Sequence, residues 1–121
     1  QGQLAKLYSS ADCVIVPSLV ESFGQVALEA LACETPVVCF NCSGLIDIVI
    51  DSESGLLATP YSAEDLAEKI KNMILLPKEN RAALGQNGRK HVIQKFSYPV
   101  VSKQYNRIIN DTIKLKSKVR H

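Results

Sequence analysis

The sequence has no apolar run long enough to span a membrane, and its beginning lacks the charged, apolar and small-residue segments of a secretory signal. These two absences predict a cytoplasmic protein. There is also no internal repeat and no low-complexity segment. What is present, 121 residues with 46% hydrophobic content, fits one compact domain that buries about two-thirds of its unfolded surface.

Basic residues are scarce in the first half of the chain. Residues 1–60 contain one Lys and seven acids, a net charge of −6, whereas residues 61–121 contain thirteen Lys or Arg and five acids, a net charge of +8. This pattern favours a solvated helix face and tail in the second half. The alternative is a peripheral contact between the basic segment KLKSKVRH and the inner face of an anionic membrane; no nucleic-acid partner is predicted.

The sequence lacks the second cysteine pair that a zinc site requires. Its four cysteines, Cys13, Cys33, Cys39 and Cys42, include one C-x-x-C in VCFNC, which is half of such a site or a redox pair. A redox pair normally begins a helix, but Cys39 lies in a β-branched run that is typical of a strand. The pattern therefore favours reduced, packed thiols and predicts no metal.

Strand and helix patterns alternate in the first half. DCVIVP and PVVCF are short apolar runs typical of strands buried on both faces of a parallel sheet, and GLLA predicts a third strand. Helices are expected at about 4–11, 24–33, from the SAED segment (which resembles a capping box) to Pro77, at 78–96, and beyond Ser97. The sequence thus predicts a single α/β domain over 1–121. Its Rossmann-like partial parallel sheet of about three strands is flanked by helices, with an α/β part at about 1–60 and a helical part at about 61–121.

Two glutamates bracket the start of the second helix in ESFGQVALEA. Gln25 and Glu29 lie one turn apart on one face of a helix that is otherwise apolar or small. The helix follows a buried strand, so it begins at the sheet edge where open α/β folds bind ligands. Its first N–H groups have no helical partners and favour a phosphate or diphosphate, which Gly24 allows to come close.

The same spacing gives the two acids a candidate role. Glu29 can accept two hydrogen bonds from a vicinal diol such as a ribose, and Glu21 can do so for a hydroxylated group beyond the phosphates. A nucleotide linked to a sugar fits this order of groups. Two plainer interpretations remain open: Glu21 is an acid placed favourably at a helix N-terminus, and Glu29 is the exposed stripe of a surface helix.

Several ordered motifs in the chain resemble family 4 of the retaining glycosyltransferases, which have the GT-B fold. They are LYSSAD, the run ADCVIVPSLVESFGQVALEALACETPVV with its E-x₇-E pattern, NCSGLIDIVIDSESGLL, and KFSY. The resemblance extends from about Leu4 to the last predicted helix and covers the donor-binding, C-terminal part of the family. Their order and separation make this set far more specific than E-x₇-E alone.

The resemblance implies a role for each matching residue. Glu29 would bind the ribose hydroxyls of the donor, and Glu21, the implied catalytic residue, would contact hydroxyls of the donor sugar. Leu57 would lie beside the base. The full set of implied donor-binding residues is Glu21, Ser22, Phe23, Gly24, Gln25, Glu29 and Leu57.

The implied reaction transfers a glycosyl unit from a nucleotide sugar with retention of configuration. It requires no metal and no cofactor besides the donor, because amides and basic side chains stabilise the diphosphate. The acceptor would be a glycan, a lipid or a small molecule, as in polysaccharide biosynthesis, and would bind through the family's N-terminal domain.

The chain departs from the family pattern in two places. It reads SGLID where a Gly-Gly-x-Pro-Glu run is common, so Ser43 and Asp47 stand at Gly and Glu positions and Ile46 replaces the proline. Glu34 stands where a glycine is usual, which is expected to change only the helix end.

The chain opens on Gln1, and it lacks the family's first three C-terminal-domain strands, their Arg/Lys pair and the N-terminal domain. We therefore expect a piece of a longer protein that alone has little transferase activity and binds nucleotide weakly. Two other functions remain open: a non-catalytic nucleotide- or anion-binding module, and a basic interaction domain.

Overall fold

A computed structural model describes residues 2–19, 24–42 and 44–96 of the chain. The described elements are α1 (Gly2–Ser10), β1 (Val14–Val16), α2 (Gln25–Ala32), β2 (Val37–Phe40), β3 (Gly55–Ala58), α3 (Ala63–Leu75) and α4 (Lys78–Phe96). The predicted helix beyond Ser97 lies outside the described residues. Each other predicted element is present, with ends within about two residues of the expected ones.

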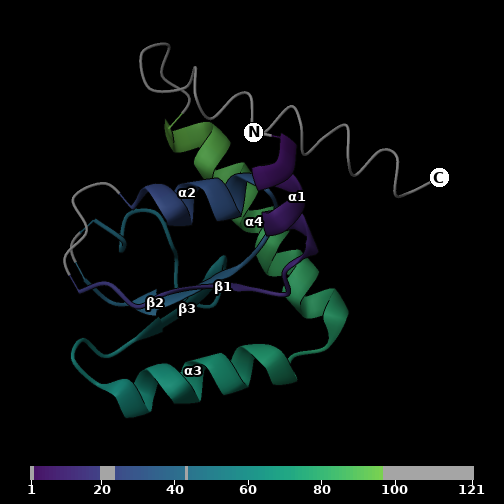
Figure 1. Cartoon of the computed structure of the whole chain (residues 1–121). Coiled ribbons are helices and arrows are strands. Elements are labelled where there is room, and N and C mark those ends of the chain that lie inside the picture. The colour runs from purple at the N-terminus through teal and green to yellow at the C-terminus, as the bar shows by residue number, and fades with distance from the viewer. Residues whose placement is uncertain (1, 20–23, 43, 97–121) are drawn as a thin grey trace.

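The three strands form a parallel sheet in the order β1-β2-β3. Figure 1 shows α1, α2 and α4 on one side of this sheet and α3 on the other. The central strand, β2, is buried at all four positions, as its unbroken apolar sequence predicts. The predicted α/β fold class with a partial three-stranded parallel sheet is therefore confirmed.

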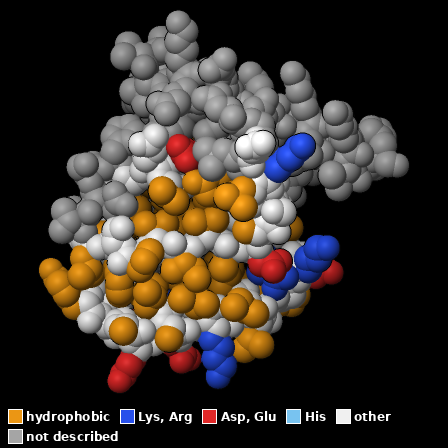
Figure 2. All heavy atoms as spheres, viewed as in Figure 1, with side chains coloured by type: hydrophobic (Ala, Val, Ile, Leu, Met, Phe, Trp, Pro, Cys, Tyr) orange, Lys and Arg blue, Asp and Glu red, His pale blue; other side chains and the backbone are white. Residues whose placement is uncertain are grey.

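The core lies between the sheet and α2. Six of the eight residues of α2 are buried, among them Leu28 and Leu31, which are 1% and 0% exposed. Burying one such side chain contributes about 1.5–3 kcal/mol to stability. Figure 2 shows further apolar side chains gathered between α2 and α3, over the face that β1 presents in this view.

The end of α2 is fixed by a backbone turn and by α4. The Thr35 N–H bonds to the Ala30 carbonyl and the Glu34 N–H to the Leu31 carbonyl, both at 3.0 Å, which together form a Schellman motif. Glu34 occupies the left-handed position of this motif, with φ 60°. The sequence comparison with the family placed a glycine here, and the structure shows why the helix end favours one.

Gly85 brings the backbone of α4 against the same turn. A Cβ atom at Gly85 would overlap the carbonyl oxygen of Glu34, so the two backbones are in direct contact. Beside this contact, Arg89 and Glu34 form an ion pair at 3.6 Å with both side chains only 13% exposed. The polar helix α4 is thus held on α2 by a glycine and a partly buried ion pair.

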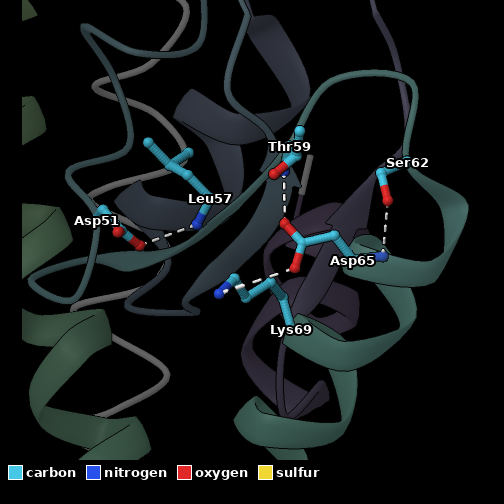
Figure 3. A network of polar contacts seen from close by, with 6 residues as sticks. All are labelled: Asp51, Leu57, Thr59, Ser62, Asp65 and Lys69. Carbon is cyan, nitrogen blue, oxygen red and sulfur yellow. Dashed lines mark hydrogen bonds and ion pairs between the residues drawn. The ribbon is translucent and has the colours of Figure 1, made fainter.

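The start of α3 is closed by its own side chains (Figure 3). The Ser62 hydroxyl accepts the Asp65 N–H at 3.1 Å, as the capping box predicts. The second half of the box is wrong, because the Asp65 carboxylate accepts the Thr59 N–H at 2.7 Å while the Ser62 N–H donates to the Thr59 carbonyl. The preceding loop turns back far enough to bring Thr59 within reach of this carboxylate.

Among residues 2–19, 24–42 and 44–96, no helix combines the length and the apolar character that crossing a bilayer requires.

Candidate functional site

The candidate site begins where α2 starts, beyond the carboxyl end of β1. Gly24 is the N-cap residue, with φ 65° and ψ 41°, a left-handed conformation that glycine adopts without strain. A Cβ atom here would lie 2.6 Å from Ile48 Cδ1 and 3.2 Å from the Gly44 carbonyl oxygen. The loop after β2 therefore packs directly on the start of α2, and Gly24 leaves room for it.

The first backbone amides of α2 are available to a ligand as far as the helix itself is concerned. Its first intrahelical bond runs from the Leu28 N–H to the Gly24 carbonyl at 3.0 Å, so the N–H groups of the preceding three residues have no helical acceptor. Gly24 has no side chain to cap them, and the first turn contains no acidic residue. The partial positive charge of the helix start is thus not offset by carboxylates in this turn.

Glu29 is buried one turn into α2 rather than displayed to solvent. The residue is 8% exposed, which makes the interpretation as a surface stripe wrong. One carboxylate oxygen, Oε2, accepts the Tyr8 hydroxyl at 3.0 Å, and the other, Oε1, accepts Gln25 Nε2 at 3.3 Å. A buried carboxylate is costly unless it is hydrogen-bonded, and these contacts from α1 and α2 meet that requirement.

Tyr8 was not among the residues that the sequence singled out. Burial of its ring, followed by the hydrogen bond to Glu29, raises the pKa of the hydroxyl well above its usual value of 10.0. The hydroxyl therefore remains a proton donor throughout the neutral range. Its partner is 21 positions away on a different helix, so no local spacing in the sequence pointed to the pair.

Leu57 lies apart from α2, on β3. It pairs with Cys39 in the strand register, and its partly buried side chain packs against the hydrophobic core. Its backbone N–H donates to the Asp51 carboxylate at 3.0 Å (Figure 3). The structure thus brings Gly24, Gln25 and Glu29 together on α2 and holds Leu57 two strands away from β1.

Glu21, Ser22 and Phe23 lie outside the described residues, so their implied roles stay predictions. The same is true of Ser43 in the SGLID segment. Asp47 in that segment is described, and its carboxylate pairs with Lys95 of α4 at 3.9 Å. Its carbonyl oxygen also contacts His91 Nε2 at 3.0 Å, so this turn is tied to α4.

None of the four cysteines forms a disulfide, and both members of C-x-x-C pack as the sequence favours, because Cys42 is half-buried against the core. Cys39 is fully buried in β2, and burial raises the pKa of its thiol to about 12. A thiol with such a pKa is almost entirely protonated at neutral pH and is a poor redox nucleophile. No group of His, Cys, Asp and Glu within the described part of the chain is arranged to hold a metal ion.

Comparison with known proteins shows which family this chain matches. Residues 1–91 match the family described as glycosyl transferases group 1. D-inositol 3-phosphate glycosyltransferase from Saccharomonospora viridis is 47% identical over 95 residues, which cover 78% of this chain and 22% of that protein. This chain spans only 20–28% of the length of the curated relatives that it matches.

Solved structures share the fold. The C-terminal domain of a glycosyl transferase group 1 family protein, LpcC, from Francisella tularensis has a TM-score of 0.65 and 32% identity, covering 74% of this chain and 46% of that one. HepE from Anabaena, solved with UDP-glucose, has a TM-score of 0.72 and 25% identity, covering 98% of this chain and 30% of that one. The chain belongs to the glycosyl transferase group 1 family, and its fold corresponds to part of a C-terminal GT-B domain.

Proposed function

We propose that this chain is the donor-binding portion of a retaining glycosyltransferase, and that it binds a nucleotide sugar along the first two turns of α2. The observation that carries the proposal is the buried, doubly hydrogen-bonded Glu29 one turn beyond a set of uncapped amides. Burying a carboxylate is unfavourable, so the burial of Glu29 at this position points to ligand binding rather than to solubility. A ligand that combines a diphosphate with a diol would use both features.

The diphosphate is assigned to the start of α2. The uncapped amides and the helix dipole favour an anion, and Gly24 lets the backbone approach it. As the glycosyl bond to the diphosphate breaks, negative charge develops on the leaving group. Fixed amide donors would stabilise that charge without a metal ion.

The ribose is assigned to Glu29, in keeping with the role that the family resemblance implies. Glu21, Ser22 and Phe23 would extend the site toward the donor sugar, with Glu21 as the catalytic residue, and Leu57 would lie beside the base. HepE, which was solved with UDP-glucose, supports a nucleotide sugar as the class of ligand. The donor base, the sugar and a glycan, lipid or small-molecule acceptor are left open by this proposal.

The cytoplasmic location and the peripheral membrane contact remain proposals of the sequence. The basic segment on which the membrane contact depends, KLKSKVRH, lies outside the described residues.

The test measures donor binding to the wild-type chain and to Glu29→Ala by calorimetry or thermal shift, with UDP-, GDP- and ADP-sugars. Glu29→Ala should weaken the tightest of these at least about tenfold, because hydrogen bonds to a charged group contribute about 1.5–3 kcal/mol. Glu64→Ala, which removes an exposed acid from the first turn of α3, is the matched control and should leave binding unchanged.

Inorganic pyrophosphate separates this function from a simple anion-binding module. Glu29→Ala should leave pyrophosphate binding near its wild-type value while nucleotide-sugar binding falls. Equal binding of the nucleotide sugar by wild type and Glu29→Ala would refute the ribose assignment, and with it the proposed function.

A further inference from the structure

A hydrogen bond between two helices holds the acid at the centre of the candidate site. The Tyr8 hydroxyl of α1 donates to Glu29 Oε2 of α2 at 3.0 Å. The second contact of this carboxylate, Gln25 Nε2 to Oε1 at 3.3 Å, comes from its own helix. Among the residues that the structure describes, each carboxylate oxygen therefore has one donor, and the two donors come from different helices.

The number of remaining acceptor positions matches a diol. A carboxylate offers about four lone-pair positions, two on each oxygen. Tyr8 and Gln25 occupy one on each oxygen of Glu29, and no other donor within residues 2–19, 24–42 and 44–96 takes the second. Two hydroxyl groups on adjacent carbons can donate to the two oxygens of one carboxylate, so the free positions suit the 2′- and 3′-hydroxyls of a ribose.

Tyr8 is itself fixed in place. The Thr35 hydroxyl, at the end of α2, donates to the Tyr8 carbonyl oxygen at 2.6 Å. Burial of Tyr8 raises the pKa of its hydroxyl, which keeps the proton on the tyrosine oxygen and makes the hydroxyl a donor to Glu29. The orientation of the carboxylate is thus set by a second helix that is anchored at a separate point.

We propose that Tyr8 is a positioning residue that holds Glu29 so that its carboxylate accepts both ribose hydroxyls of the donor at once. This inference rests on the proposed function and adds a specificity to it. A 2′-deoxyribose would leave one oxygen of the oriented carboxylate without its ligand partner. The site would therefore discriminate against deoxynucleotides, and Tyr8 would contribute to that discrimination.

The test is the ratio of affinities for a ribonucleotide and its deoxy form. The probes are the nucleoside diphosphate that binds tightest among UDP, GDP and ADP, and its 2′-deoxy counterpart. The wild-type chain should prefer the ribo form about tenfold, because a missing hydrogen bond to a charged group weakens binding by at least that factor. Tyr8→Phe, which keeps the ring and removes the hydroxyl, should lower this ratio at least about threefold.

Ser10→Ala is the matched control for a merely structural role. It removes an exposed hydroxyl of α1 that donates to the Leu7 carbonyl at 3.0 Å and touches neither Tyr8 nor Glu29. A general loosening of α1 would weaken both probes equally, so Ser10→Ala should leave the ratio at its wild-type value. Tyr8→Met, which also lacks the hydroxyl, replaces Tyr8→Phe if circular dichroism shows that the latter is unfolded.

The outcomes distinguish the positioning role of Tyr8 from the ribose assignment of Glu29. If Glu29→Ala abolishes the ribo preference and Tyr8→Phe keeps it, the positioning role is wrong while the proposed function stands. If Glu29→Ala itself keeps the preference, the ribose assignment fails first. Adding Tyr8→Phe to Glu29→Ala should change the ratio no further, and an additional fall would overturn the claim that Tyr8 acts through Glu29.

Discussion

The helices α2 and α3 both begin beyond the carboxyl end of a strand of the same sheet, yet their first turns are built in opposite ways. At α3, Ser62 caps an amide, and two acids, Glu64 and Asp65, stand in the first turn. At α2, the cap is Gly24, which has no side chain, and the first turn has no acid. Among the described residues, side chains close the start of α3, and none closes the start of α2.

The difference separates a structural helix start from a binding one. The acids of α3 offset the positive end of its dipole and would repel an anion, whereas the amides of α2 remain available to one. The Asp65 carboxylate accepts an amide of its own loop, whereas the Glu29 carboxylate of α2 accepts only two side-chain donors within the described part of the chain. Three variants test whether this contrast is functional.

The largest effect is expected for Gly24→Ala. Alanine would have to adopt the left-handed backbone conformation of Gly24, and its Cβ would lie 2.6 Å from Ile48 Cδ1. Together these effects should lower the free energy of unfolding by about 1–3 kcal/mol. Nucleotide-sugar binding should fall as well, because the same backbone forms the opening of α2. Urea unfolding measures the first effect and calorimetry the second; wild-type values in both would show that the glycine is dispensable.

A smaller effect, confined to stability, is expected for Ser62→Ala. Loss of the N-cap hydroxyl should lower the free energy of unfolding by about 1 kcal/mol. Donor binding should be unchanged, since α3 lies on the other side of the sheet from α2. Thermal and urea unfolding give the stability, with Ser52→Ala as a control in an exposed turn; a binding defect in Ser62→Ala would break the contrast between the two helix starts.

The smallest effect is a pH dependence at α3. The Thr59 backbone N–H lowers the pKa of Asp65 from its ordinary value of 3.8. Because the folded-state pKa is below the unfolded one, this contribution to stability is present above about pH 3.8 and is lost as the pH falls below it.

Asp65→Asn should therefore reduce the loss of stability between about pH 4 and pH 2, as followed by urea midpoints in that window. Glu64→Gln, one position earlier, controls for the general loss of a negative charge. An unchanged acid profile in Asp65→Asn would mean that its bond to Thr59 contributes nothing to folding.

Much of the fold could be predicted because its elements are short and locally marked. VIV and VVCF are short apolar runs that begin with β-branched residues. Pro77 separates α3 from α4, and Ser62 is an N-cap residue that marks the start of α3. The parallel arrangement followed from the alternation of strands and helices. The family resemblance added the identity of the domain, which the match of residues 1–91 to the family confirmed.

The site was harder to predict from the sequence, because its key contacts join residues that are far apart in the chain. Glu29 could be recognised as an acid in an apolar helix, but its burial and its hydrogen bond to Tyr8 arise from tertiary packing that brings α1 against α2. The spacing pattern left exposed and buried interpretations open, and only the contact between α1 and α2 decided between them. The capping box failed in its second half for a similar reason, since the loop conformation, not the spacing, brings Thr59 to Asp65.

Gly85 ties the C-terminal end of α2, opposite its ligand end, to a helix far along the chain. Its direct backbone contact with Glu34 leaves no space for a side chain between α4 and the turn after α2, so we expect this contact to fix how α2 lies against α4. Saturation mutagenesis scored by donor affinity should accordingly find an intolerant position in the middle of α4, a helix whose sequence otherwise gives no sign of a role in recognition.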